Sequence, residues 1–346
     1  MTTTTVSPAI TVQLPPMYFP AALEAHPRIE LMEERGLAWM ARYGFCSDPV
    51  QATRVRDSRS AHFFGYLCPE ADVDRLQVAV DWAYLMFVFD DLPSDGDPSS
   101  LLDFAVRVVR TLEEPGTNLL PPDNPFTAPI VDLATRVHRC CAPEHVRRLA
   151  DSHMKWLLGA AWETTVAKRS DEQSLNDYLS ARVMYAAAEP TFTWAQLSET
   201  AVVPEREIAA PRVRALTEMA GAVAAIDNDL YSHGKDLWEL RSRPDLVGIH
   251  QTGLDLAECV ALRDRIVARF FELRDEVLPT ASPALARYLH NLTCTLRGNF
   301  EWGLETARYS NPDGNHPGAI RTVATVSNTP SAVGPPGIPS VDWWWR

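Results

Sequence analysis

The sequence has little cysteine, and its six cysteines form no recognisable site. No C-x-x-C pair occurs and no spacing with histidine suits zinc, so neither a zinc site nor a disulfide framework is supported. Long apolar runs are also missing, because none reaches the roughly 18 residues of a membrane-spanning helix. The N-terminus has neither the basic start nor the apolar core of a signal peptide. We therefore expect a cytoplasmic protein with no membrane partner.

Positive charge is scarce as well. The chain has 32 lysines and arginines against 45 aspartates and glutamates, which gives a formal net charge of −13. Nucleic acids are bound by clustered basic side chains, so no nucleic-acid partner is expected. An anionic small molecule remains allowed as substrate if a metal ion or a few local cations reverse the field. A chain of 346 residues can bury a large core as one domain, and a homodimer is one open arrangement.

Strand patterns are absent too, since no run alternates valine, isoleucine or threonine with polar residues, and we predict an all-α fold. Residues 1–20 are rich in threonine and proline and are expected to pack as an extended strap. Residues 21–310 are expected to form the helical domain. Residues 311–346 are expected to fold back over it, because three consecutive tryptophans near their end are disfavoured in water. Apolar periodicity predicts helices over residues 27–43, 50–67, 70–92, 99–113, 127–140, 143–168, 174–199, 206–240, 255–278 and 283–309.

One stretch carries three oxygen donors at helical spacing. Asn228, Ser232 and Asp236 fall at i, i+4 and i+8, so an amide, a hydroxyl and a carboxylate share one face of the predicted helix. Mg²⁺ prefers oxygen ligands and is usually completed by water and substrate phosphate. Lys235 stands beside the last donor, where it can meet a phosphate. For this pattern taken alone, a polar helix face in water is the alternative.

A second acidic cluster follows an aromatic helix. Asp90, Asp91 and Asp95 surround Pro93, and this proline is expected to end the helix near the two adjacent aspartates. Carboxylates at a helix C-terminus lie against the negative end of the helix dipole, which is unfavourable unless a cation is present. The cluster therefore favours a second set of metal ligands, with an acidic loop in solvent as the alternative.

Two further features supply positive charge and a free carbonyl. Pro190 has no N–H to donate to the carbonyl of Ala186, which is expected to stay free in mid-helix and to face a cation. Arg182, one turn earlier, suits bidentate phosphate binding. Arg308 and Tyr309 close the last predicted helix and offer a second guanidinium and a hydroxyl. Each feature alone is compatible with an ordinary protein surface.

Together, these features resemble the signature of the class I terpene cyclases, most closely the bacterial sesquiterpene cyclases of the selinadiene synthase type. In that family an aspartate-rich motif and an Asn-Asp-x-x-Ser-x-x-x-Glu triad hold the metal. A diphosphate-sensing arginine lies 46 residues before the triad, as Arg182 does before Asn228, and an Arg-Tyr pair follows roughly 80 residues after it, as Arg308 and Tyr309 do. The resemblance runs from Pro15 onward and implies an α-helical bundle around a deep central pocket.

The resemblance also implies a mechanism, in which metal ions and cations promote departure of diphosphate from a prenyl diphosphate substrate. The ligands of three Mg²⁺ ions would be Asp90, Asp91, Asp95, Asn228, Ser232 and Asp236. The groups that bind and ionise the substrate would be Arg182, Lys235, Arg308 and Tyr309, with the carbonyl of Ala186 facing the cation. Aromatic faces would stabilise that cation. The candidates on helices near the motifs are Phe63, Phe64, Tyr84, Phe87, Trp194, Phe300 and Trp302.

Some departures and alternatives stay open. The triad ends in Asp236 where glutamate is usual, and Tyr185 stands where an acidic residue is frequent. Farnesyl diphosphate, which gives a sesquiterpene, is the preferred substrate, and geranylgeranyl diphosphate, which gives a diterpene, is the alternative. A chain-elongating prenyltransferase is disfavoured because the second motif is not rich in aspartate. A non-catalytic helical scaffold would be expected to have lost some of these donors.

Overall fold

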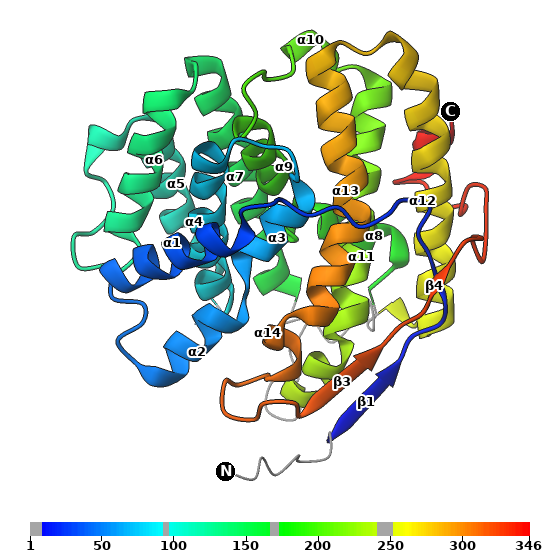
Figure 1. Ribbon diagram of the computed structural model, residues 1–346, viewed down its shortest axis with the longest axis horizontal. Helices are drawn as coiled ribbons and strands as arrows, with labels where there is room; N and C mark the ends of the chain where they lie inside the picture. Colours follow the sequence, from blue (N-terminus) through cyan, green and yellow to red (C-terminus); the bar gives the residue numbers. More distant parts are fainter. Residues whose placement is uncertain (1–8, 93–96, 167–172, 241–251) are drawn as a thin grey trace.

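The computed structural model shows a bundle of α-helices (Figure 1), and it describes residues 9–92, 97–166, 173–240 and 252–346. The predicted all-α class is confirmed. The described helices are α1 (Ile29–Arg42), α2 (Pro49–Asp57), α3 (Ser60–Leu67), α4 (Val73–Asp90), α5 (Pro98–Glu113), α6 (Thr127–Cys140), α7 (Pro143–Val166), α8 (Leu175–Tyr185), α9 (Ala188–Leu197), α10 (Glu205–Ile208), α11 (Pro211–Glu239), α12 (Leu256–Val277), α13 (Pro283–Glu305) and α14 (Ala307–Ser310).

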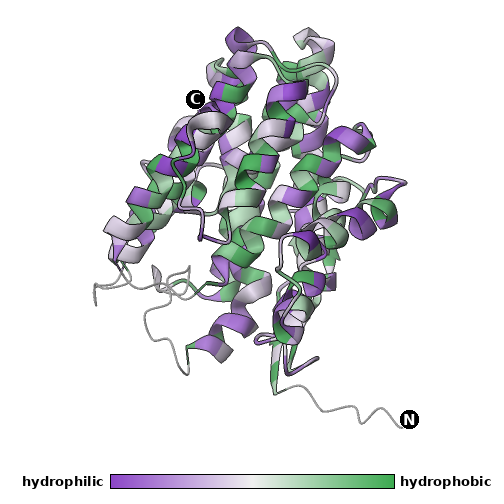
Figure 2. Ribbon diagram, turned by 90° about the vertical axis from the view of Figure 1, so that its left-hand side faces the viewer, coloured by the Kyte–Doolittle hydropathy of each residue, from purple (hydrophilic) through white to green (hydrophobic). Residues whose placement is uncertain are grey.

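The core lies where the helices cross one another. The longest of the described helices, α11, packs against α12 and α13. Small residues allow close approach at such crossings: a Cβ added at Gly303 of α13 would lie 2.3 Å from the ring of Tyr231 on α11. Figure 2 shows hydrophobic and hydrophilic residues mixed along each helix, as amphipathic helices around a shared core require.

Two predicted helices are each divided by a residue with positive φ. The predicted helix over residues 50–67 is α2 and α3, because Arg59 between them has a φ of 44°. The predicted helix over residues 174–199 is α8 and α9, because Ala187 has a φ of 56°. A left-handed residue cannot continue a right-handed helix, and this conformation is uncommon outside glycine. In the second stretch Pro190 signals a disruption of the helix, whereas no residue type in the first stretch marks the break at Arg59.

Two other predicted helices run past the ends of the observed ones. Pro211 occupies the first turn of α11, where its missing N–H removes no helical bond, and the residues before it form the separate turn α10. At the other end of the domain Thr306 is extended, with a ψ of 134°, so α13 stops at Glu305. Arg308 consequently lies on a short helix of its own, α14.

Pairs of short strands join the N-terminal segment to the C-terminal one, which the sequence analysis did not predict. The strands are β1 (Ile10–Gln13), β2 (Met17–Tyr18), β3 (Ile320–Val323) and β4 (Val326–Ser327). β1 pairs with β3 and β2 with β4, both in parallel. Strands of two to four residues are too short to show a period of two in a sequence. A Cβ added at Gly234 of α11 would lie 2.5 Å from Ile320, so the strands lie against α11.

A buried ion network on α12 holds both terminal segments. Arg263 is 0% exposed, donates to Asp227 on α11 at 2.8 Å and also donates to the carbonyl of Tyr18. Asp264 accepts the backbone N–H of Tyr18 at 3.2 Å and that of Ser331 at 2.9 Å. Burial raises the pKa of Asp227 to about 6 despite the opposing charge of Arg263. Both chain ends therefore depend on neighbouring residues of one helix.

The last residues of the chain lie against the bundle. A short 3₁₀ helix (Asp342–Trp345) places Trp344 in a buried position, where its indole N–H donates to Glu218 on α11 at 3.2 Å. The division into strap, helical domain and tail remains a proposal. None of the described helices combines the length and the apolarity that a membrane crossing requires.

We predict that Arg263→Ala lowers the free energy of unfolding by about 3–5 kcal/mol, because it leaves Asp227 and Asp264 buried without their counter-charge. Chemical denaturation followed by circular dichroism measures the loss. Arg212→Ala is the control, because Arg212 forms an exposed ion pair with Glu276 at 3.3 Å whose removal should cost less than about 1 kcal/mol. Equal losses in the two variants would contradict the role given to the buried network.

Candidate active site

A cavity of about 160 Å³ lies among α3, α4, α7, α8, α9, α11, α13 and α14. Part of its wall is aromatic or otherwise apolar, and part carries charged and polar side chains. Asp90, whose side chain is 72% exposed, marks the side that faces solvent. The residues of the wall are Phe63, Trp82, Ala83, Met86, Phe87, Asp90, Trp156, Arg182, Tyr185, Ala186, Ala187, Ala188, Thr191, Phe192, Gly221, Ala224, Ala225, Asn228, Tyr231, Thr295, Asn299, Trp302 and Tyr309.

The acidic cluster at the end of α4 meets cations from two other helices. Arg308 of α14 donates to Asp91 at 2.7 Å and to Asp90 at 2.9 Å, and Lys235 of α11 lies 3.7 Å from Asp91. Burial works to raise the pKa of Asp91, but the charges of Arg308 and Lys235 outweigh it and hold the pKa below its usual value. Asp91 is therefore a carboxylate at neutral pH. Asp95 lies outside the described residues.

The triad on α11 offers a set of oxygen donors that fits a hard cation. Ser232 donates to Asp236 at 2.9 Å, so the two side chains lie one above the other as their spacing predicted. Burial raises the pKa of Asp236 to about 7, and the charge of Asp229 adds to the rise. A divalent cation bound between these groups would stabilise the ionised form of Asp236 and so oppose the rise in its pKa. Amide, hydroxyl and carboxylate oxygens are ligands that Mg²⁺ accepts. Asn228, the third donor, lies in the cavity wall.

Arg182 reaches the triad from α8. Its guanidinium donates to Asn228 at 2.8 Å and to Asp229 at 2.5 Å, and the hydroxyl of Tyr178 also donates to Asp229. Burial opposes the charge of Arg182, yet the carboxylate of Asp229 raises its pKa above the usual value. Among the described residues, the Nε atoms of Arg182 and Arg308 have no hydrogen-bond partner. Each buried guanidinium thus keeps a donor that a bound anion can satisfy.

The carbonyl that Pro190 was expected to free lies at a helix break and not in mid-helix. Ala186 follows the last residue of α8 and lines the cavity. Pro190 cannot donate to it, and the left-handed Ala187 turns the chain into α9, where the N–H of Thr191 donates to the carbonyl of Ala187 at 3.1 Å. The expectation of a continuous kinked helix is corrected, because α8 ends at Tyr185 and a new helix, α9, begins at Ala188.

Three of the predicted aromatic residues line the cavity: Phe63, Phe87 and Trp302. The rings of Phe87 and Trp302 are stacked with their centroids 5.3 Å apart, and Arg308 lies 4.8 Å from the centroid of Phe87. The indole N–H of Trp302 donates to the carbonyl of Ser58 at 2.9 Å, which fixes the ring. These rings connect the charged side of the cavity to its apolar interior.

The other predicted aromatics lie outside the cavity wall, and the expectation is corrected for Phe64, Tyr84, Trp194 and Phe300. All four are buried at 2% exposure or less. The ring of Tyr84 faces α1, where a Cβ added at Gly36 would lie 2.5 Å from it. Trp194 contributes to a second, smaller cavity. Sequence places these residues on the right helices but does not say which way each side chain points.

Comparison with known proteins places the chain in a family. It matches the family described as terpene synthase family 2, C-terminal metal binding, over residues 81–267. It is 81% identical over 346 residues to phomopsene synthase of Allokutzneria albata, with 100% of both chains covered. The chain belongs to the terpene synthase family. It is a bacterial class I terpene cyclase, as its motifs predicted, and a lyase that acts on prenyl diphosphates.

Other similarities extend over the whole of this terpene synthase. The diterpene cyclase DtcycA of a Streptomyces species is 29% identical to it, with 100% of this chain and 99% of that protein covered. The crystal structure of SVS_A2, a protein from ancestral sequence reconstruction, matches it with a TM-score of 0.82 at 36% identity, covering 96% of this chain and 98% of that one. Its fold is therefore the class I α-helical fold.

The sequence analysis missed several wall residues of this terpene synthase: Trp82, Trp156, Phe192 and Tyr231. Two of them carried a usable signal. Trp82 precedes Asp90 by eight residues, about two helical turns, and Tyr231 follows Asn228 by three, so each shares a helix face with a predicted ligand. Trp156 and Phe192 lie on helices with no predicted ligand beside them. Their positions follow only from how α7 and α9 pack.

We predict that Asp91→Asn lowers kcat/KM for diphosphate release about 100-fold or more, because it removes a partly buried carboxylate that faces two cations and the proposed metal site. Asp103→Asn is the control, because Asp103 forms an exposed ion pair with Arg107 at 2.9 Å and has no part in the proposed site. Its loss should stay below about twofold. Steady-state assays of released diphosphate measure both, and equal losses would contradict the role given to Asp91.

Proposed function

We propose that this terpene synthase binds a linear prenyl diphosphate together with Mg²⁺, ionises it and cyclises the resulting cation. The observation that carries the proposal is that Arg182, Asn228 and Asp90 line the same cavity as a set of aromatic and aliphatic side chains. The metal-binding description of the family supports a divalent cation. Its identity as Mg²⁺ and a count of three ions are part of the proposal.

The charged side of the cavity is suited to a leaving diphosphate. Mg²⁺ bound there would neutralise the negative charge that develops as the carbon–oxygen bond breaks. The side chains proposed to hold it are Asp90, Asp91, Asn228, Ser232 and Asp236. Arg308 and Lys235 lie within 3.7 Å of Asp91, so a diphosphate at this place meets two cations at once. Arg182 donates a hydrogen bond to the side chain of Asn228, which in turn donates one to the hydroxyl of Tyr309. Both groups therefore lie beside a proposed metal ligand.

The apolar side is suited to a carbocation. The faces of Phe63, Phe87 and Trp302 can attract it, each by about 2 kcal/mol in a desolvated site. The hydroxyl protons of two polar wall residues are engaged with the protein, because Thr191 donates to the carbonyl of Ala187 and Thr295 to that of Asn291, both at 2.8 Å. We propose that the carbonyl of Ala186 presents the negative end of its dipole to the cation.

The size of the wall residues favours a C20 substrate. Much of the wall consists of residues with one side-chain carbon or none: Ala83, Ala186, Ala187, Ala188, Gly221, Ala224 and Ala225. Such residues leave room for a chain that is longer by one five-carbon unit. The similarity to a diterpene cyclase over the whole chain supports the same length. We therefore propose geranylgeranyl diphosphate ahead of farnesyl diphosphate, which reverses the order favoured by the sequence motifs.

The test is incubation of the purified protein with geranyl, farnesyl or geranylgeranyl diphosphate and Mg²⁺, with products analysed by gas chromatography and mass spectrometry. We expect a cyclic C20 product from geranylgeranyl diphosphate and its loss when the metal is removed with EDTA. A longer chain formed on addition of isopentenyl diphosphate would indicate an elongase. Absence of diphosphate release from all three substrates would overturn the proposal, and products from farnesyl diphosphate alone would overturn the proposed length.

We predict that Ala83→Leu shifts the preference toward farnesyl diphosphate. The substitution adds three carbons to the wall, one turn before Phe87, and each methylene excluded from a pocket changes selectivity about tenfold or more. The C20 to C15 product ratio in an equimolar mixture measures the shift and should fall at least about tenfold. Ala83→Gly is the control, because it adds no volume and should leave the ratio near or above that of the parent protein. An unchanged ratio in Ala83→Leu would show that this wall does not set chain length.

A further inference from the structure

Three side chains with metal-binding atoms meet where the segment before α1 passes α13. They are Glu24 from that segment and His290 and Cys294 from α13. A carboxylate oxygen, an imidazole nitrogen and a sulfur all lie within 4.8 Å of one another. None of the three residues lines the cavity of the proposed active site, so the proposed reaction does not account for the cluster.

The His290 nitrogen faces both of its neighbours at once. His290 and Cys294 stand four residues apart on α13, which places their side chains on one face of the helix. Nε2 of His290 lies 3.6 Å from the sulfur of Cys294 and 3.5 Å from Oε2 of Glu24. One ring nitrogen can make one hydrogen bond, as donor or as acceptor, and so cannot serve both neighbours. The distance to Glu24 is also longer than the roughly 2.9 Å of a typical N–H···O hydrogen bond.

These distances match the separations between ligands of a tetrahedral zinc ion. Zinc binds thiolate sulfur at about 2.3 Å, imidazole nitrogen at about 2.0–2.1 Å and carboxylate oxygen at about 2.0–2.2 Å. At the tetrahedral angle, these bond lengths place sulfur and nitrogen about 3.6 Å apart and nitrogen and oxygen about 3.4 Å apart. The observed 3.6 Å and 3.5 Å therefore need almost no adjustment. Any closure between sulfur and oxygen falls to Glu24, whose side chain is 46% exposed and free to turn.

The surroundings place the sulfur at the base of the cluster and leave a way in from solvent. Cys294 is 3% exposed, whereas the side chain of His290 is 32% exposed. Arg287, on the turn before His290, would repel a cation, but its charge is matched by an ion pair with Glu70. Burial raises the pKa of the Cys294 thiol to about 12, and Glu24 and Glu70 add to the rise. A metal ion that binds the thiolate would therefore release one proton to water.

We propose that Glu24, His290 and Cys294 bind one zinc ion, with water as the fourth ligand. Three protein ligands and a water are an established zinc coordination. A thiolate and an imidazole favour zinc, whereas Mg²⁺ prefers oxygen ligands, so the two metals would occupy separate sites. The sequence analysis supported no zinc site because two of these ligands alone form no zinc motif. The third is far away in the sequence, and only the fold brings it to them.

The bound ion would connect two parts of the chain that lie far apart in sequence. Glu24 belongs to the segment between β2 and α1, and His290 and Cys294 belong to the helix that carries Asn299 and Trp302 of the cavity wall. Because a ligand that binds only the folded state stabilises it, zinc should raise the melting temperature. The proposal does not rest on the cyclase function, since no substrate enters it.

Cobalt(II) is the probe for the site, because it replaces zinc in tetrahedral sites and absorbs in the near ultraviolet when a thiolate binds it. The titration uses the Cys140→Ser/Cys141→Ser protein, because the sulfurs of Cys140 and Cys141 lie 3.5 Å apart and can bind the ion themselves. Excess Mg²⁺ occupies sites that offer only oxygen. We expect the thiolate absorption to saturate at one cobalt per chain and to disappear when zinc is added. Absence of this absorption would overturn the proposal.

Variants in the same background identify the ligands. Cys294→Ser should abolish the thiolate absorption, and Cys259→Ser is the matched control that should keep it, because Cys259 is also a buried helical cysteine, 1% exposed on α12. His290→Ala keeps the thiolate and should raise the Kd for cobalt about tenfold or more, the least that even the loss of a group supporting a ligand costs. Equal absorption in Cys294→Ser and its parent would overturn the site.

The melting temperature tests the site without a spectroscopic probe. Zinc should raise it in the Cys140→Ser/Cys141→Ser protein, and Glu24→Gln in that background should reduce the shift. Glu24 is largely exposed, so its substitution should leave the melting temperature without zinc unchanged. No shift in the parent, or an equal shift in Glu24→Gln, would overturn the proposal. If Cys294→Ser does not fold, Glu24→Gln and His290→Ala still decide it.

Discussion

Two buried arginines paired with carboxylates hold the charged side of the cavity together. Arg308 connects α14 to the end of α4 through Asp91, and Arg182 connects α8 to α11 through Asp229. Removing such charges from water costs several kcal/mol per ion, so each guanidinium is tolerated only because a carboxylate lies against it. The charge of Arg308 in turn lowers the pKa of Asp91, so that carboxylate stays ionised. The proposed metal and diphosphate would enter an arrangement that is already close to neutral, which reduces the reorganisation that binding requires.

The helix that carries the triad is supported from outside by both ends of the chain. Asp227, one residue before Asn228, is bonded to the buried Arg263, and Gly234, between Ser232 and Asp236, lies against β3. Neither contact touches the cavity. A helix held on its outer face cannot rotate away from the cavity, so the strands and the ion network fix the direction in which the oxygen donors point. β3 also packs against α14, which carries Arg308 and Tyr309, so the terminal segments support the site through both helices.

The charged side of the site could be predicted from the sequence because its geometry is local. Donors four residues apart on one helix must lie on one face, and a proline must end or break a helix nearby. The apolar wall could not be predicted in the same way, because it depends on how each helix is oriented about its axis against its neighbours. Phe63 and Phe64 are adjacent in sequence, yet only Phe63 lines the cavity. The positive φ of Ala187, which turns the chain at the cavity, is likewise set by packing and not by residue type.

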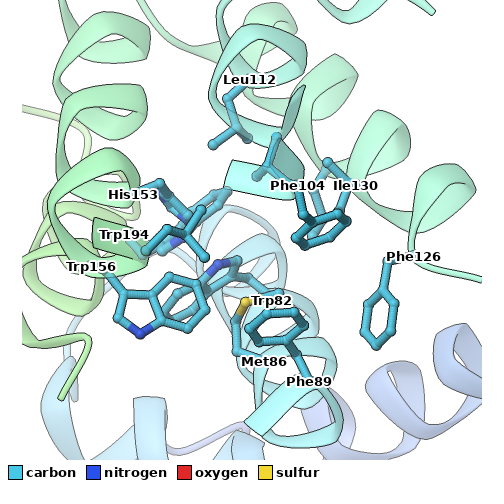
Figure 3. A pocket seen from close by; sticks show the side chains of 13 residues that line it. Trp82, Met86, Phe89, Phe104, Leu112, Phe126, Ile130, His153, Trp156 and Trp194 are labelled. Carbon is cyan, nitrogen blue, oxygen red and sulfur yellow. The ribbon is translucent and has the colours of Figure 1, made fainter. Parts of the chain in front are cut away.

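A cavity that holds a carbocation faces two demands that conflict. The wall must offer electron-rich groups, and tryptophan provides the best aromatic face, yet every indole also brings an N–H that needs a partner. In Trp302 the conflict is resolved by a backbone carbonyl outside the cavity, which accepts the N–H and leaves the face to the interior. Trp82 has no such partner within the described residues, so its ring belongs to the walls of both cavities, the smaller of which is shown in Figure 3, at the cost of one buried, unpaired donor.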